Sequence, residues 1–269
     1  MAPDGSHGSI RRHGRPLATS AGPVSSGRAA APMALGMPAA SDLALVQGLQ
    51  HTRATLARWS AAPWPVLRGW LVGAFSIAAG LLLSVVVIGT AMEPGASLIA
   101  FPGLTEPATL GAVGEVLKRN ALVLALHGFA CVAGFIAGSS LPAQAERYSG
   151  LYRRIHDRAG PLAIAFVVAA TAFSLATQAF VLGAGAATLA AQGGISPAML
   201  LLGLLPHAVP ELVALFLPLA AWVVASRRGE WHELLAATIA TVALAVPVLV
   251  AAAFVEVYVS PQLILALRG

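Results

Sequence analysis

The residues best suited to chemistry lie in one short stretch, residues 206–212, with the sequence Pro-His-Ala-Val-Pro-Glu-Leu. The stretch falls in the middle of an apolar run that extends from about residue 195 to residue 226. His207 and Glu211 can form hydrogen bonds, couple to an ion or bind a metal. Because ionisable side chains are costly inside a membrane-crossing segment, their presence there favours a functional site.

The two prolines of this stretch predict a break in the helix. Pro206 and Pro210 lack a backbone N–H, so we expect the ladder of helical hydrogen bonds to fail between them. Pro210 suits the first position of a second half-helix. Glu211 would then lie in that half-helix's first turn, where the helix dipole favours an anion. Broken helices of this kind often line substrate or ion sites in membrane proteins.

A metal centre is one alternative for these residues. His207 and Glu211 are four positions apart, and His127 and Glu256 could complete a set of the ligands that zinc accepts. The prolines, however, would disturb the geometry that places residues four apart on one helix face, and the chain has no His-Glu-x-x-His motif. We therefore expect no metal and no other cofactor. Motifs for a serine hydrolase, a phosphate loop and a dinucleotide site are also missing.

Composition places these residues in a membrane protein. Of 269 residues, 58% are hydrophobic and only 10% are charged, whereas soluble domains contain about 25% charged residues. Several apolar runs reach the length of about 20 residues that a helix needs to cross a bilayer. We predict an all-α, polytopic membrane helix bundle. The net charge of +5 is interpreted as a topology signal, so no nucleic-acid partner is expected.

Three regions follow along the chain. Residues 1–40 are rich in Gly, Ser, Ala, Pro and Arg and are predicted to be a disordered tail. Residues 41–68 are predicted to be a cytoplasmic or interfacial segment, with a short amphipathic helix and a loose linker as alternatives. Residues 69–269 are predicted to form the transmembrane bundle. Its five expected spans lie at about 69–92, 120–138, 161–187, 195–226 and 234–259, and the fourth is the broken one.

Arginine distribution predicts the orientation of the spans. The N-terminal segment and the loops at 139–160 and 227–233 carry nearly all the arginines. The positive-inside rule then places the N-terminus in the cytoplasm and the C-terminus outside. Lys118 and Arg119 are exceptions on the outer side. The five tryptophans all fall at the cytoplasmic interface in this arrangement: Trp59, Trp64, Trp70, Trp222 and Trp231.

The position of each polar residue along its span gives an estimate of its depth in the bilayer, and several of these depths agree. With a rise of about 1.5 Å per residue, five of them fall in the outer half of the bilayer: His127, Gln178, His207, Glu211 and Glu256. We predict a polar cluster of these residues and Asn120 that faces the bundle interior or an outward cavity. Glu211 or Glu256 should lie within about 6 Å of His127 or His207. The alternative is that these groups only bond one another and lock the bundle.

Three stretches of the sequence resemble one protein family. Residues 206–212 are similar to a Pro-His-Gly-x-x-Glu-Leu signature, with Ala208 in place of the glycine. Residues 251–261, Ala-Ala-Ala-Phe-Val-Glu-Val-Tyr-Val-Ser-Pro, resemble the family's C-terminal motif. Arg119 and Asn120 open a helix in which small residues recur every fourth position, at Ala130, Gly134 and Gly138. The chain thus resembles the stage II sporulation protein M family over roughly residues 45–265.

This resemblance implies a prokaryotic inner-membrane protein with about five or more spans. The family's namesake works with two partners in a septal peptidoglycan-remodelling complex, as a scaffold rather than as the hydrolase. We therefore expect a non-enzymatic scaffold or recruiting subunit of an envelope complex in the bacterial inner membrane. Its expected partners are the lipid bilayer and membrane or envelope proteins, and homo-oligomerisation stays open. The alternatives are a small-solute transporter or channel and, third, an intramembrane metal-dependent hydrolase.

Overall fold

The structure is a computed structural model that describes residues 44–142 and 149–268. The predicted disordered tail, residues 1–40, lies outside the described residues. The described part of the chain is helical and contains no β-strand, which confirms the all-α prediction. Its elements are α1 (Ala44–Ala61), α2 (Trp64–Ala91), α3 (Leu110–Phe135), η2 (Ile136–Ser140), α5 (Gly150–Gly193), α6 (Pro197–Arg228), η3 (Trp231–Glu233), α7 (Leu234–Phe254), η4 (Val255–Val259) and α8 (Ser260–Ala266).

Within the described residues, five helical segments are long and apolar enough to cross a membrane, as the sequence predicted. They are α2, α3 with η2, α5, α6, and the run from η3 to α8. The second begins at Leu110, ten residues before the expected start. The difference arises because Glu115, Lys118 and Arg119 lie within the first turns of α3, and a helix does not have to end at the hydrocarbon boundary.

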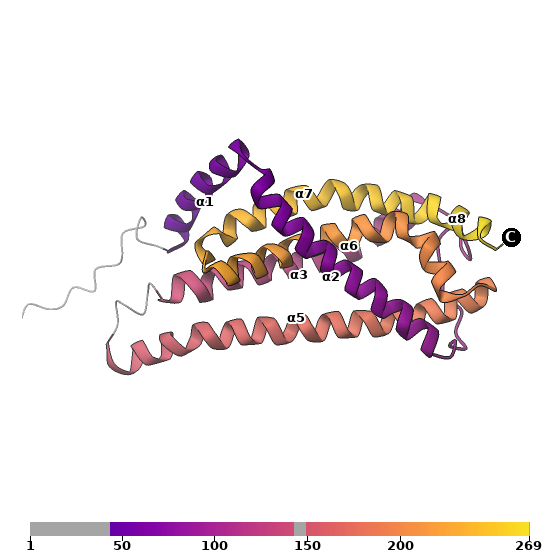
Figure 1. Cartoon of the computed structure of the whole chain (residues 1–269), viewed down its shortest axis with the longest axis horizontal. Coiled ribbons are helices and arrows are strands. Elements are labelled where there is room, and N and C mark those ends of the chain that lie inside the picture. Colours follow the sequence, from indigo (N-terminus) through magenta and orange to yellow (C-terminus); the bar gives the residue numbers. More distant parts are fainter. Residues whose placement is uncertain (1–43, 143–148, 269) are drawn as a thin grey trace, which may run out of the picture. The chain divides into compact units, whose positions relative to one another are not determined.

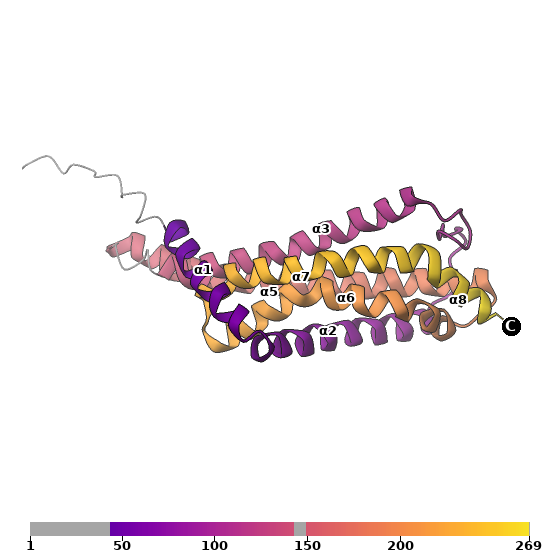
Figure 2. The ribbon, with the colours of Figure 1, turned by 90° about the horizontal axis from the view of Figure 1, so that it is seen from above.

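Helix α6 is the central element of the bundle. It packs against α2, α3, α5, α7 and α8 (Figures 1 and 2). In its most apolar 18-residue window, 56% of the residues are buried, against 6% in α5. The sequence defines both ends of α6: the Ser196 side chain caps the first turn by accepting the Met199 N–H, and Gly229 adopts a left-handed conformation at the other end. The helix that carries the candidate chemistry is therefore the most enclosed one.

The predicted break in this span is wrong. α6 is continuous from Pro197 to Arg228 and contains Pro206, Pro210 and Pro218 in its interior. The ribbon bends in the first third of α6 without being interrupted (Figure 1). A proline removes one helical hydrogen bond and bends the axis, but close packing by neighbouring helices keeps the remaining turns helical. Glu211 consequently does not lie at the start of a half-helix and gains nothing from a helix dipole there.

The ends of the bundle are arranged as the predicted topology requires. In Figure 1, α1, the beginning of α5 and the connection from α6 to α7 lie at one end, while the connection from α5 to α6 and the C-terminal α8 lie at the other. At the first end, Arg58 forms an ion pair with Glu233, with 2.6 Å between Nη2 and Oε1. Two tryptophan pairs also contact each other there, Trp59 with Trp70 and Trp222 with Trp231. The arginine-rich connections therefore share one end.

Small residues in α3 allow the close approach that their spacing predicted. A Cβ added at Gly134 would collide with Trp222 of α6 and Leu234 of α7. One added at Gly138 would collide with the Trp231 ring. The missing side chains let two tryptophans of the bundle pack directly on the backbone of α3 and η2.

The contact at Gly134 predicts a difference between two glycine substitutions. Gly134→Ala should lower the thermal unfolding temperature in detergent, because the Trp222 and Leu234 side chains must shift to admit the methyl group. Gly80→Ala is the matched control, because a Cβ at Gly80 on α2 meets nothing within 4 Å. Equal unfolding temperatures for the two variants would contradict the packing described here.

Cysteine labelling tests the orientation of the bundle in the cell. In a chain with Cys131 replaced by Ala, cysteines introduced at the exposed positions Ser149 and His232 should resist a membrane-impermeant thiol reagent applied from outside. A cysteine at the exposed Ala191, near the opposite end, should react. The reverse labelling pattern would invert the topology and remove the basis of the depth estimate.

Candidate functional site

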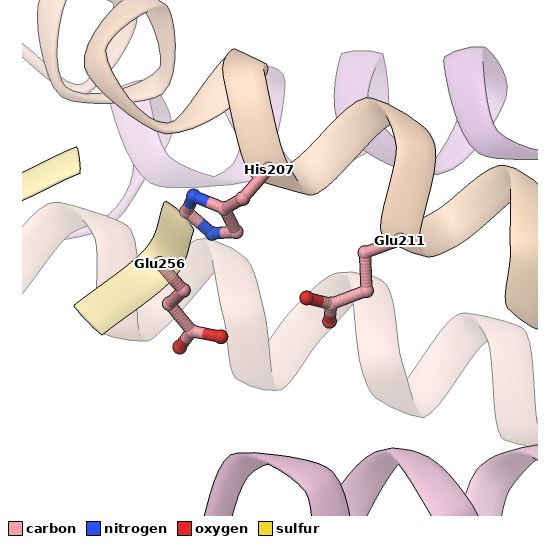
Figure 3. A group of neighbouring side chains, drawn as sticks. All are labelled: His207, Glu211 and Glu256. Carbon is pink, nitrogen blue, oxygen red and sulfur yellow. The ribbon is translucent and has the colours of Figure 1, made fainter. Parts of the chain in front are cut away.

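Three ionisable side chains converge where α6 meets the C-terminal segment. His207 and Glu211 come from α6, and Glu256 comes from η4. One ligand atom of each residue lies within 4.8 Å of the others. Figure 3 shows the imidazole and both carboxylates facing a common space. The expectation that one of the two glutamates would approach a histidine to within about 6 Å is therefore confirmed.

The continuity of α6 explains why His207 and Glu211 meet. Residues four apart in a helix lie on one face, and the interior prolines have not disrupted this relation. Glu256 reaches the same space from a π-helical turn, in which the Ser260 N–H bonds the carbonyl of Val255, five residues earlier. Pro261 follows directly and has no N–H for the usual bond to Val257. π-helical turns occur frequently at functional sites.

A hydrogen bond fixes the orientation of the histidine ring. His207 Nδ1 lies 2.6 Å from Ser260 Oγ, and the Ser260 side chain is fully buried at the start of α8. Because Nδ1 is engaged by the serine, Nε2 is the ring nitrogen left for the two carboxylates. An outer partner of this kind commonly sets which nitrogen of a histidine acts as a ligand.

Two buried polar atoms beside this group have no hydrogen-bond partner among the described residues. They are Glu211 Oε2 and Asn120 Nδ2. Asn120, on α3, is only 8% exposed and lies beside the Glu211 carboxylate. Each unpaired buried group costs about 1–3 kcal/mol. A network that served only to lock the helices would be expected to pair these atoms.

Two of the predicted cluster residues lie elsewhere. His127 Nδ1 donates to the backbone carbonyl of Leu215 at 2.9 Å, and its ring packs against Phe216. Gln178 donates through Nε2 to Ser174 Oγ on its own helix at 3.1 Å. The depth estimate assigns these side chains to one layer with Glu211, but depth does not specify the direction in which a side chain leaves its helix.

An apolar cavity adjoins the polar group. It has a volume of about 280 Å³, and His207, Glu211 and Glu256 form part of its wall. The remaining wall is mostly aliphatic and comes from α2, α5 and α6, with Phe101 from the connection between α2 and α3. A mostly apolar cavity with a few convergent polar groups is the usual form of a small-molecule or ion site.

Comparison with known proteins bears on the same residues. Residues 158–261 match the family model described as Stage II sporulation protein M. Over this segment the chain is similar to that family. The SpoIIM-matching segment includes His207, Glu211, Glu256 and Ser260, whereas Asn120 lies outside it. No curated protein and no solved structure matches the chain.

Sequence reasoning missed two residues of the site. Ser260, the partner of His207, stands in the Ser-Pro pair that closes the second motif, directly after the fifth expected span. Arg119 lies close enough to Glu256 to interact electrostatically. Its position directly before Asn120 at the opening of the second predicted span was the available signal.

Substitution of Ser260 tests the orientation of the histidine. Ser260→Ala should leave His207 Nδ1 without a partner and destabilise the fold by about 1–3 kcal/mol, measured by denaturation in mixed micelles. Ser76→Ala is the control, because that exposed hydroxyl donates only to the Val72 carbonyl of its own helix. A Ser260 variant as stable as the control would show that this hydrogen bond does not hold the ring.

Proposed function

We propose that the protein is a non-enzymatic scaffold or recruiting subunit of a cell-envelope complex of the bacterial inner membrane. The match of residues 158–261 to the Stage II sporulation protein M family carries this proposal. The namesake of the family that the chain resembles assembles with partners in a peptidoglycan-remodelling complex. The five apolar helices supply the multi-pass membrane anchor that such a subunit needs.

Helix α5 supplies the surface on which a partner would be recruited. With 44 residues, it is about 66 Å long at 1.5 Å per residue, against a hydrocarbon core of about 30 Å. Its apolar face is open along the bundle, with large exposed side chains at Leu162, Phe166, Phe173 and Phe180. A transmembrane helix of a partner would lie along this face, and the first turns of α5, which carry Arg154 and Arg158, would extend beyond the membrane.

Site-specific photocrosslinking tests recruitment in intact cells. A photoreactive phenylalanine analogue at Phe173 should crosslink to one defined envelope protein, and that protein should co-purify with the unmodified full chain. The same analogue at Phe75, an exposed phenylalanine on α2, serves as the control and should give only lipid adducts. Lipid adducts alone at both positions, with no co-purifying envelope protein, would contradict the scaffold proposal.

A second candidate is a transporter or channel for a small solute. The observation that favours it is the polar group in the wall of the 280 Å³ cavity. A transporter would take up a solute in proteoliposomes, and Glu211→Gln would preserve the fold while abolishing uptake. A scaffold would show no uptake in either form and would keep its partner in the Glu211 variant.

A further inference from the structure

The arrangement of ligand atoms in the site leads beyond a scaffold role. We propose that His207, Glu211 and Glu256 together bind one divalent transition-metal ion, with Zn²⁺ as the ion that best suits the donors. One imidazole nitrogen and two carboxylate oxygens form a donor set that zinc accepts. The ion would link α6 to the segment formed by η4 and α8.

The spacing of the ligand atoms fits an ion after a small contraction. Because the three atoms lie within 4.8 Å of one another, one point lies no more than about 2.8 Å from each of them, and zinc binds nitrogen and oxygen at about 2.0–2.2 Å. A ligand atom would therefore have to move by no more than about 0.6–0.8 Å to reach bonding distance. That shift is within the reach of the Glu211 and Glu256 side chains without any movement of the helices.

The objection to a metal from the sequence does not hold in the structure. We expected the prolines to separate His207 and Glu211 onto different faces, but α6 is continuous through them. The two residues therefore have the one-face, four-apart spacing found in helical metal sites. Glu256 of η4 adds the third ligand, as the sequence allowed, whereas His127 does not join the group.

The surroundings of the three ligands support an ion in several ways. Ser260 holds His207 Nδ1, as expected for an outer partner that presents Nε2 to a metal. Glu211 Oε2 is buried and unpaired, and a metal would supply its partner. Asn120 is more than nine-tenths buried and faces Glu211 with an unpaired Nδ2, which can donate to the carboxylate once it ligates.

The charges of the site also favour a bound cation. Two carboxylates that share one low-dielectric space repel each other and disfavour ionisation. Arg119 lies near Glu256 and offsets part of that charge, whereas the side chains that act on Glu211 are Glu256 and the uncharged Asn120. A divalent cation would neutralise both carboxylates, and the cavity on their open side would leave a fourth coordination position for water or a ligand.

Metal content of the purified full chain tests the proposal. The purified chain is first stripped of bound metal with a chelator, then incubated with Zn²⁺ and desalted. Elemental mass spectrometry should then find about one zinc ion per chain. Zinc should also raise the thermal unfolding temperature, because a ligand that binds only the folded state stabilises it. Co²⁺ in place of zinc should give the visible absorption of a protein-bound ion.

Near-isosteric variants separate the site from incidental binding. Glu211→Gln and Glu256→Gln should each lose the bound zinc and the thermal shift while keeping a monodisperse elution profile. Ser260→Ala should retain the ligands but weaken zinc binding about 10–100-fold. Glu106→Gln, at an exposed carboxylate in the connection between α2 and α3, is the control and should bind as the native chain does.

Two results would overturn the proposal. One is a native chain that retains no zinc and shows no thermal shift with Zn²⁺ or Co²⁺. The other is equal zinc retention by the Glu211, Glu256 and Glu106 variants, which would assign the metal to adventitious binding elsewhere. Neither result depends on partner recruitment, so failure of the metal site and failure of the scaffold role are distinguishable.

Discussion

The backbone of α6 imposes the main constraint on this bundle. It lies at the centre of the helices and contains three interior prolines, each of which removes a hydrogen-bond donor in a region without bulk water. Packing and hydrogen bonds from neighbouring helices therefore help to hold α6 in place. Helix α3 does so twice: His127 donates to the carbonyl of Leu215, and the Cys131 thiol donates to the carbonyl of Pro218. These bonds fix α3 against α6, which brings the first turns of α3, and with them Asn120, toward Glu211.

Close packing at the opposite end of α6 completes the site. A Cβ at Gly203 would collide with Ile264 of α8, so the absence of a side chain there lets α8 lie directly on α6. This contact brings Ser260 to His207, one turn further along α6. Glu256 follows because it stands one turn before Ser260 in the same C-terminal segment. Small residues and apolar packing around the polar group thus bring its side chains together. Contacts between the polar side chains themselves contribute little to this arrangement.

The sequence was informative about elements and depth but not about direction. Apolar runs predicted the five spans, because the bilayer dictates segment length. Depth predicted that Glu211 and Glu256 share a layer with a histidine, because the helical rise is fixed. The direction in which the His127 and Gln178 side chains point depends on which helices pack beside their own. The periodicity of apolar residues along the sequence does not reveal those neighbours. The error at Pro206 and Pro210 has a similar origin, because helix propensity is local whereas the packing that keeps α6 continuous is not.

Helix α5 connects the two proposals for this protein in physical terms. Its outward face is the open apolar surface assigned to a partner, while residues on its other side, such as Leu182 and Leu189, line the cavity beside His207 and Glu211. Ligands at these two places can influence each other only if each favours a different arrangement of a shared element. α5 is such an element, since it contacts α6 and also has the least buried apolar window of the five spans. Any coupling between recruitment and the polar site should therefore run through the packing of α5 against α6, rather than through the polar side chains themselves.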